Sequence, residues 1–332
     1  MIKAAFLATS GQIHPVYNGG RKEKVSLEFD LFPDVITSTT LEERHSELKD
    51  IEYLFSTWGM ISLNKEQIAL LPSLKAVFYS AGSVQGFARP FLEAGVKVFS
   101  AWAANAIPVA EYTVAQILLA NKGFFRATHC IKSKQDRNKL DSKSLHGNYE
   151  TTIALLGAGM IGRAVIERLK SYDLNIIVFD PFLSDTDAAD LGVEKVSLED
   201  AFKRGLVVSN HLANLPETKA MLKGPHFEIM PEYSTFINTG RGATLDEKAM
   251  INVLQSRPDL TALLDVTCPE PPEEGSPLYT LKNVILTPHI AGSKGDQEVL
   301  RMADFMIEEA ISLREGNALK YEVTEKMLKT MA

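Results

Sequence analysis

Residues 151–163 read TTIALLGAGMIGR, and this stretch decides the fold. An apolar run of strand length, Thr151–Leu156, leads directly into a G-x-G-x-x-G motif at Gly157–Gly162, and helical spacing follows over Ile161–Ser171. A strand, a glycine-rich turn and a helix in this order begin a dinucleotide-binding βαβ unit. The first glycine allows the tight turn, the second lets backbone approach a pyrophosphate, and the third lets helix and strand pack closely.

The backbone of this loop, rather than its side chains, is suited to binding phosphate. Gly159 is the middle glycine, and the amides of Met160 and Ile161 follow it at the expected start of the helix. Amides at a helix N-terminus bind anions, and the helix dipole favours negative charge there. We therefore predict that Gly157, Gly159, Met160, Ile161 and Gly162 hold the phosphates of a dinucleotide.

Asp180 directly follows the next expected strand, Asn175–Phe179, about 20 residues after the middle glycine. A carboxylate at this position accepts hydrogen bonds from the ribose hydroxyls of the adenosine. The alternative is that Asp180-Pro181 only starts a turn. No Lys or Arg occurs between Lys170 and Lys195, so a 2′-phosphate would meet negative charge and no cation. The sequence thus favours NAD over NADP.

Length and composition exclude several classes of protein. A chain of 332 residues favours two domains, and its formal net charge of −7 disfavours nucleic acid and anionic membranes as partners. The two cysteines, Cys130 and Cys268, cannot build a disulfide framework and lack the spacing of metal ligands. No apolar run approaches the roughly 18 residues of a membrane span, and no signal segment precedes the first strand. We expect a cytoplasmic protein that uses no metal.

From Thr151 onward, short apolar runs alternate with helical segments, which predicts a doubly wound parallel sheet. Helical spacing over Ile161–Ser171 and Glu247–Gln255 locates two of the helices that cover this sheet. Its six expected strands are Thr151–Leu156, Asn175–Phe179, Leu206–Ser209, Thr235–Ile237, Leu260–Leu264 and Val284–Leu286.

A separate α/β domain precedes this sheet. Its expected strands are Lys3–Ala8, Tyr53–Ser56, Ala76–Ser80 and Lys97–Ser100, with helical segments at Leu41–Leu48 and Asn64–Leu70. Ala106–Phe124 predicts a long apolar helix with Pro108 in its first turn. The amphipathic helix Gln297–Leu313 follows the completed sheet and is expected to return to the first domain. We therefore expect a discontinuous substrate-binding domain, residues 1–100 and 294–332, and a dinucleotide-binding domain, residues 101–293.

The residues that directly follow the expected strands of the second domain carry the candidate chemistry. They are Gly157, Asp180, His211, Asn238–Arg241, Asp265 and Pro288–His289. Each alone is typical of an ordinary loop. Ligands of open α/β sheets bind outside the carboxyl ends of the strands, so together these residues indicate one shared site.

The sequence resembles the D-isomer-specific 2-hydroxyacid dehydrogenase family over most of the chain beyond Lys75. The matching stretches are GAGMIG at Gly157–Gly162, HLANLPET at His211–Thr218, INTGRG at Ile237–Gly242, LDVTCPEPP at Leu264–Pro272, LTPHIAGS at Leu286–Ser293 and NAIPVAEYT at Asn105–Thr113. Their order and spacing also match. The resemblance implies a Rossmann-type doubly wound parallel sheet, a second, smaller flavodoxin-like α/β domain, and NAD as cofactor.

The resemblance also implies roles for single residues. Arg241, Glu270 and His289 match the family's catalytic arginine, acid and histidine, and Asp265 matches a residue near the nicotinamide. The residues assigned to the cofactor pocket by the resemblance are His211, Leu212, Thr239, Gly240, Arg241, Asp265, His289 and Gly292.

For the substrate, the resemblance points to the first domain. Ala81, Gly82 and Ser83 match the loop whose backbone amides hold the substrate carboxylate, although Ser83-Val84-Gln85-Gly86 replaces the usual glycine–aspartate pattern. Asn105 and Trp58 are further candidates for the pocket. For Trp58, as for Trp102, plain core packing is an equal alternative.

The residue types fit hydride transfer to a 2-oxo acid. A guanidinium offers a planar fork of donors to a carboxylate and the neighbouring carbonyl oxygen. Hydride transfer leaves negative charge on that oxygen, and a protonated His289 delivers the needed proton. Glu270 close by would favour the imidazolium and hold the ring.

We expect a small, unphosphorylated 2-oxo acid as substrate, such as glyoxylate, hydroxypyruvate or one with a modest apolar side chain. The expected wall segments contain Trp58, Phe87 and Trp102 but no Lys or Arg, whereas a phosphorylated substrate would require a cation there. The sequence also ends at Ala332, too soon after His289 for the regulatory C-terminal domain of the longer phosphoglycerate enzymes.

Two further expectations follow from the resemblance. It suggests a homodimer formed through Ala106–Phe124. It also leaves open a non-catalytic, NADH-sensing interaction protein, since the C-terminal-binding-protein corepressors share this fold and the same trio. Formate dehydrogenases of this fold carry glutamine at the position of Glu270, which counts against that branch.

Overall fold

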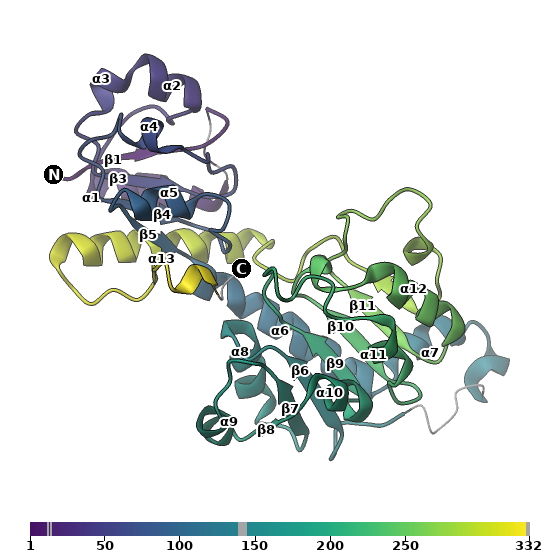
Figure 1. The fold of residues 1–332 in the computed structure, drawn as a ribbon. Coiled ribbons are helices and arrows are strands. Elements are labelled where there is room, and N and C mark those ends of the chain that lie inside the picture. The colour runs from purple at the N-terminus through teal and green to yellow at the C-terminus, as the bar shows by residue number, and fades with distance from the viewer. Residues whose placement is uncertain (12, 14, 139–144, 330–332) are drawn as a thin grey trace. The chain divides into compact units, whose positions relative to one another are not determined.

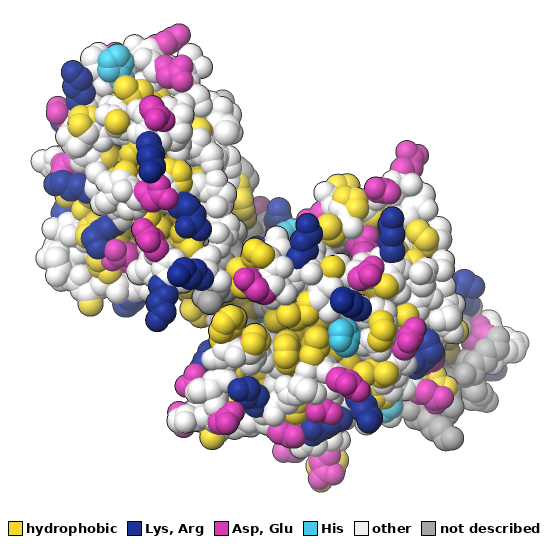
Figure 2. All heavy atoms as spheres, viewed as in Figure 1, with side chains coloured by type: hydrophobic (Ala, Val, Ile, Leu, Met, Phe, Trp, Pro, Cys, Tyr) yellow, Lys and Arg dark blue, Asp and Glu magenta, His cyan; other side chains and the backbone are white. Residues whose placement is uncertain are grey.

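The computed structural model describes residues 1–11, 13, 15–138 and 145–329, and the chain forms two compact units (Figure 1). Unit 1 comprises Met1–Asn105 and Ser293–Ala332, and unit 2 comprises Ala106–Gly292. On the face shown in Figure 2, acidic and basic side chains are interspersed over both units.

Unit 2 is built on a sheet that has seven parallel strands among the described residues. The strands are β6 (Thr152–Leu156), β7 (Asn175–Phe179), β8 (Glu194–Lys195), β9 (Val207–Asn210), β10 (Thr235–Asn238), β11 (Thr261–Leu264) and β12 (Val284–Leu286). Their order, β12-β11-β10-β9-β6-β7-β8, reverses between β6 and β9. This is the Rossmann arrangement, which binds ligands where the order reverses. The predicted doubly wound sheet is confirmed.

Alternation along β6 supplies two hydrophobic cores, one on each face of the sheet. Ile153 and Leu155 belong to one core, and Ala154 and Leu156 to the other. The first core is completed by α6 (Trp102–Asn121), α8 (Met160–Leu169) and α9 (Asp185–Leu191). The second is completed by α10 (Leu198–Arg204), α11 (Gly224–Glu228) and α12 (Glu247–Ser256), which lie in front of the sheet in Figure 1.

Unit 1 contains a second, mostly parallel sheet. Its strands are β1 (Lys3–Phe6), β2 (Asp30–Leu31), β3 (Tyr53–Ser56), β4 (Ala76–Tyr79), β5 (Lys97–Ser100) and β13 (Glu322–Val323). The order is β13-β5-β4-β3-β1-β2, in which only β13 is antiparallel to its neighbour in the described part of the chain. The first five strands therefore follow the flavodoxin-like order that was expected.

Aromatic rings on alternate strand positions form the core on one face of this sheet. The rings of Phe55 and Phe78 stack with centroids 5.2 Å apart, and those of Phe78 and Phe99 with centroids 4.9 Å apart. The helix α13 (Asp296–Glu315) covers this face through Met302, Met306 and other buried residues, together with α1 (Arg21–Glu28). The last long helix thus returns to pack with the first strands.

Four short helices complete the opposite face of unit 1. They are α2 (Ser38–Glu43), α3 (His45–Leu48), α4 (Lys65–Ile68) and α5 (Ala88–Glu93). The helical segment expected over Leu41–Leu48 is present as two short helices, α2 and α3, which are separated at Arg44. Elsewhere α7 spans Phe124–Cys130, and 3-10 helices form at Pro15–Tyr17, Lys134–Asn138, Gly242–Thr244, Pro277–Tyr279 and Met327–Lys329.

The long helix α6 differs from the expectation in two ways. It begins at Trp102, so Pro108 lies inside the helix rather than in its first turn, where its missing N–H leaves the carbonyl of Ala104 without the usual partner. By length and composition α6 is also apolar enough to cross a membrane, against the expectation that no segment would be. Half of this apolar window is buried inside the protein, as in a core helix.

The edge strand β13 depends on one buried acid. Glu309 on α13 is 3% exposed, and its Oε1 accepts hydrogen bonds from the amides of Lys320 (2.7 Å) and Tyr321 (2.9 Å). Both amides directly precede β13. The carboxylate therefore fixes the chain where it enters the sheet.

We expect Glu309→Leu to lower the free energy of unfolding by about 2 kcal/mol, because it leaves both amides without an acceptor. Glu308→Leu is the matched control, since Glu308 is the exposed neighbour on the same helix. Chemical denaturation followed by circular dichroism measures both. Equal losses in the two variants would contradict this role.

Candidate active site

The glycine loop after β6 brings two strand ends into close contact. Gly157 has a φ of +100°, and a Cβ added to it would lie 2.9 Å from the carbonyl oxygen of His211, the residue after β9. A Cβ on Gly162 would overlap the carbonyl of Gly157, so helix α8 packs directly on the turn. At Gly159, by contrast, an added Cβ would meet no protein atom within 4 Å. The loop is closed on its protein side and open where a ligand can approach.

The residues of this loop fit a dinucleotide. Gly159 caps α8, and the amides of Met160 and Ile161 lie in its first turn, where no helical acceptor precedes them. The side chain of Met160 is exposed. Free amides on the open side of a glycine loop, at the point where the strand order reverses, are suited to a pyrophosphate.

Asp180 forms a turn and also binds the glycine loop. Its Oδ2 accepts a hydrogen bond from the amide of Ala158 at 2.7 Å. Its Oδ1 accepts from the amides of Phe182 (2.7 Å) and Leu183 (3.1 Å). The turn considered as the alternative is therefore present, and the same carboxylate lies against the phosphate loop.

A buried polar network holds the loop after β10. Asn210 Nδ2 donates to Asn238 Oδ1 at 3.0 Å and to Thr244 Oγ1 at 2.9 Å, and all three residues are fully buried. Asn238 Oδ1 also accepts from the amide of Gly240 (3.1 Å), and the Thr244 hydroxyl donates to the carbonyl of Arg241 (2.7 Å). Sequence reasoning missed Asn210 and Thr244. The available signal was the position of Asn210, the last residue of an internal strand.

His211 is packed as a neutral imidazole beside the predicted cofactor residues. Its Nε2 lies 3.0 Å from the Ser209 hydroxyl, and its Nδ1 lies 3.5 Å from Thr239 Oγ1. Burial lowers the pKa of His211 to about 4, because the charged form would lose its hydration. Leu212 and Thr239 are buried next to it. These surroundings suit His211 to the wall of a pocket rather than to the role of an acid or a base.

Asp265 shapes the loop that carries His289. Its Oδ1 accepts from the Thr287 hydroxyl (2.6 Å) and the Ile290 amide (2.8 Å), and its Oδ2 accepts from the Ala291 amide (2.9 Å). The amide of His289 donates to the carbonyl of Asp265 at 3.0 Å. Within this frame His289 adopts a φ of +53°, in the left-handed region that few non-glycine residues occupy.

His289 and Glu270 form a close pair at the same edge of the sheet. The imidazole Nδ1 lies 2.6 Å from Glu270 Oε1, and the two side chains are 45% and 43% exposed. A partner on Nδ1 directs Nε2 away from Glu270, and the exposure leaves the ring accessible to a ligand.

Arg241 lies near the same acid. Burial lowers the pKa of the Arg241 guanidinium, and the negative charge of Glu270 raises it. One guanidinium nitrogen donates to the carbonyl of Gly240 at 2.8 Å. The predicted residues of unit 2 thus follow successive strands at one edge of the sheet, with Gly292 ending the last of these loops.

Unit 1 holds the other predicted residues at the carboxyl edge of its own sheet. The amide of Ala81 donates to the carbonyl of Tyr79, so it is already engaged. The amides of Gly82 and Ser83 have no protein acceptor among the described residues. Trp58 follows β3 and is partly exposed, and Asn105 accepts a hydrogen bond from the amide of Ser293 (2.9 Å). The second indole, at Trp102, packs edge-on against the ring of Tyr321.

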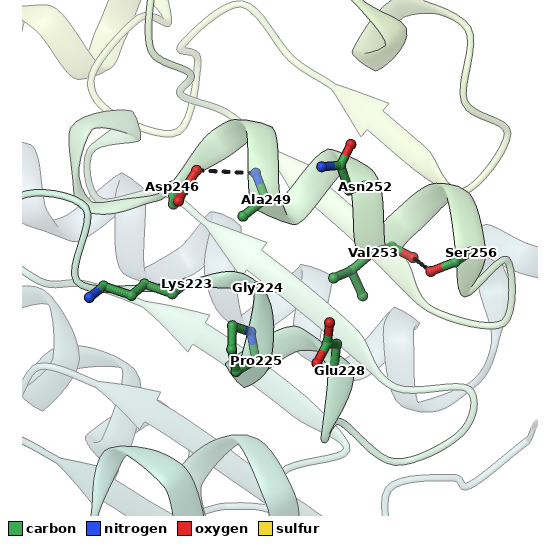
Figure 3. A pocket seen from close by; sticks show the side chains of 9 residues that line it. All are labelled: Lys223, Gly224, Pro225, Glu228, Asp246, Ala249, Asn252, Val253 and Ser256. Carbon is green, nitrogen blue, oxygen red and sulfur yellow. Dashed lines mark hydrogen bonds between the residues drawn. The ribbon is translucent and has the colours of Figure 1, made fainter.

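An open depression between α11 and α12 involves none of these residues (Figure 3). It is lined by Lys223, Gly224, Pro225, Glu228, Asp246, Ala249, Asn252, Val253 and Ser256. The Asp246 side chain there accepts from the Ala249 amide and caps α12. In the part of the chain that the structure describes, no cluster of three or more His, Cys, Asp or Glu could hold a metal ion.

Known proteins share this organisation. The family model for the NAD binding domain of D-isomer specific 2-hydroxyacid dehydrogenases matches residues 114–291. A D-3-phosphoglycerate dehydrogenase of Methanocaldococcus jannaschii is 30% identical over 298 residues, which cover 89% of this chain and 55% of that protein. A hydroxypyruvate reductase of Thermotoga maritima is 34% identical over 209 residues, or 62% of this chain and 66% of that protein.

The same fold occurs in solved structures. A phosphoglycerate oxidoreductase from Rhizobium etli superposes with a TM-score of 0.81 at 19% identity, covering 99% of this chain and 100% of that one. The chain spans about half the length of the first curated relatives it matches.

Gly159→Ala tests the open side of the loop. Because a Cβ there meets no protein atom within 4 Å, we expect thermal unfolding to stay near that of the parent. Affinity for NADH should fall, since the methyl group enters the space left for phosphate. Gly86→Ala, which also meets no atom within 4 Å, is the matched control in unit 1. Fluorescence titration with NADH measures the effect, and unchanged affinity in Gly159→Ala would show that phosphate binds elsewhere.

Proposed function

Because the chain belongs to the D-isomer specific 2-hydroxyacid dehydrogenase family, we propose that it transfers a hydride between NAD(H) and a small 2-oxo or 2-hydroxy acid. The observation that carries the proposal is the 2.6 Å pair of His289 Nδ1 and Glu270 Oε1. The pair lies at the same strand edge as the glycine loop. Bound nicotinamide supplies or accepts the hydride.

His289 is the proton donor for reduction in this proposal. Glu270 holds Nδ1, which leaves Nε2 as the atom that gives a proton to the developing alkoxide and takes it back in oxidation. Asp265 accepts hydrogen bonds from the Thr287 hydroxyl, which precedes the imidazole, and from the amides of Ile290 and Ala291, which follow it. General acid–base catalysis requires this fixed orientation, because proton transfer depends on reach before it depends on acidity.

Arg241 binds the substrate in this proposal. Its guanidinium lies within the electrostatic influence of Glu270 and offers further N–H donors to a carboxylate and to the adjacent carbonyl oxygen. Stronger bonding to that oxygen as it gains negative charge lowers the barrier to reduction. The free amides of Gly82 and Ser83 are proposed to hold the same substrate carboxylate, whereas the engaged amide of Ala81 leaves that residue a supporting role.

The remaining assignments concern the cofactor. The adenosine ribose is proposed to meet Asp180, and the nicotinamide is proposed to lie near Asp265. The other residues proposed to contact the cofactor are Gly157, Gly159, Met160, Ile161, Gly162, His211, Leu212, Thr239, Gly240, Arg241, His289 and Gly292.

Assembly and location are also proposed. Exposed apolar side chains at Leu119, Phe124 and Ile131 on and after α6 and α7 support a homodimer formed through this region. The exposed free thiols of Cys130 and Cys268 support a reducing, cytoplasmic compartment.

NADH oxidation in the presence of 2-oxo acids tests the function directly. Turnover with glyoxylate, hydroxypyruvate, pyruvate or longer 2-oxo acids is the expected result. Tight NADH binding without turnover of any 2-oxo acid would favour the NADH-sensing alternative.

His289→Asn is expected to lower kcat by about 10²–10⁴-fold, the usual contribution of a general acid. Asparagine tolerates the left-handed backbone at this position, so the loop should keep its shape and thermal unfolding should change little. Glu270→Gln and Arg241→Ala should likewise reduce turnover far more than stability. His129→Asn, at an exposed position on α7, is the control. A His289→Asn enzyme that works at the parent rate would rule out this mechanism.

NADH should give a kcat/KM at least about tenfold above that of NADPH, because Asp180 would repel a 2′-phosphate. Arg163 reaches this loop, but its Nε donates to the carbonyl of Ala158 (3.0 Å) and its Nη2 pairs with Asp187 (3.2 Å). Asp187→Asn removes the negative charge that neutralises this guanidinium and should raise kcat/KM for NADPH. Equal use of both cofactors by the parent enzyme would contradict the assignment.

A further inference from the structure

The carboxyl ends of β3, β4 and β5 bring three loops of unit 1 together. The Thr57 hydroxyl donates to the carbonyl of Ser80 at 2.8 Å. The Ser100 hydroxyl lies 2.8 Å from the carbonyl of Ala81 and 2.6 Å from that of Gly82. Buried hydroxyl groups thus fix the loop that the proposed function assigns to the substrate carboxylate.

A fourth segment reaches this edge from the other end of the chain. Asn105 Oδ1 accepts from the amide of Ser293 at 2.9 Å, and a Cβ added to Gly82 would lie 3.4 Å from Asn105 Nδ2. One side chain therefore packs against the substrate loop and holds the start of the C-terminal segment of unit 1.

The next residue of this segment is Lys294, and its ammonium group lies over an aromatic ring. The Nζ atom is 5.4 Å from the centroid of the Trp58 ring, and Lys294 is exposed. The backbone amide of Lys294 donates to Glu298 Oε2 at 3.3 Å, which fixes the main chain. Among the residues that the structure describes, no carboxylate pairs with the Lys294 ammonium. The ring attracts the charge but accepts no strong hydrogen bond, so the N–H donors stay available.

Two arginines on or against α13 are committed to carboxylates. Arg21 pairs with Asp304 at 2.8 Å, and Arg314 pairs with Glu28 at 3.0 Å. Lys294 is held instead by an indole that follows β3. The sequence expectation of a wall without cations rested on the segments next to the strands, whereas Lys294 belongs to the segment before α13.

We propose that Lys294, positioned by Trp58, binds a second anionic group of the substrate. The preferred substrate is then a 2-oxo acid whose tail ends in a carboxylate or a phosphate, in place of the uncharged tail expected from sequence. This inference rests on the proposed function. Arg241 and the amides of Gly82 and Ser83 serve the carboxylate common to all 2-oxo acids, so Lys294 determines specificity and takes no part in proton transfer.

Matched substrate pairs test the inference in the full-length enzyme. Oxaloacetate is compared with 4-methyl-2-oxopentanoate, in which an isopropyl group replaces the second carboxylate. In the other pair, 3-phosphooxypyruvate is compared with hydroxypyruvate, which lacks the phosphate. The parent should prefer the anionic member of at least one pair, and the pair that shows the preference identifies the anion as carboxylate or phosphate.

Lys294→Met removes the charge and keeps most of the length of the side chain. It should lower kcat/KM for the anionic member by about 10- to 100-fold, the loss expected for hydrogen bonds to a charged group. The kcat/KM for the uncharged member should change little. Lys22→Met, at an exposed lysine on α1, should leave kcat/KM for both members unchanged.

Three results would overturn the assignment while the proposed function stands. The first is a parent enzyme with equal kcat/KM for the two members of both pairs. The others are a Lys294→Met enzyme that loses kcat/KM equally for both members of a pair, or one that keeps the parent's preference for the anionic member. If no 2-oxo acid is reduced at all, the proposed function fails and the inference fails with it.

Discussion

The carboxylate of Asp265 satisfies three donors of one loop, and the shape of the candidate site depends on this interaction. A buried charge costs several kcal/mol unless hydrogen bonds replace its hydration. Here a hydroxyl and two backbone amides provide that replacement, and the same three bonds tie the loop after β12 to Asp265. These bonds support the positive φ of His289, a backbone conformation that persists only where its surroundings hold it. In this conformation the imidazole Nδ1 lies 2.6 Å from Glu270 Oε1.

The same device recurs at the other strand ends. Asn210 and Thr244 hold the loop of Arg241 from beneath, and Ser100 holds the loop of Gly82 in unit 1. In each case a small buried side chain on or next to a strand supplies the hydrogen bond that a loop backbone has lost by leaving the sheet. The side chains proposed for the chemistry then do not have to hold the loops themselves, and they can face a ligand.

The sequence predicts those parts of the fold that are marked by a recognisable pattern of residues. Apolar runs of strand length locate β6, β7 and β9–β12, and the glycine spacing locates the phosphate loop. The edge strands β2, β8 and β13 are two residues long, too short to show alternation. The sequence does not identify Asn210 and Thr244 either, because a buried amide or hydroxyl cannot be told from a solvent-exposed one by residue type. Lys294 and Trp58 are far apart in the chain, so only the fold brings them together.

The return of α13 to unit 1 has a consequence for the nascent chain. Unit 2 is continuous over Ala106–Gly292, so all of it leaves the ribosome before α13 and can bury both of its cores. The aromatic face that includes Phe55 and Phe78 stays uncovered during this time, because Met302 and Met306, which pack on it, are synthesised later. An apolar face left open in this way favours aggregation or chaperone capture. The first unit to be translated is the last to finish folding.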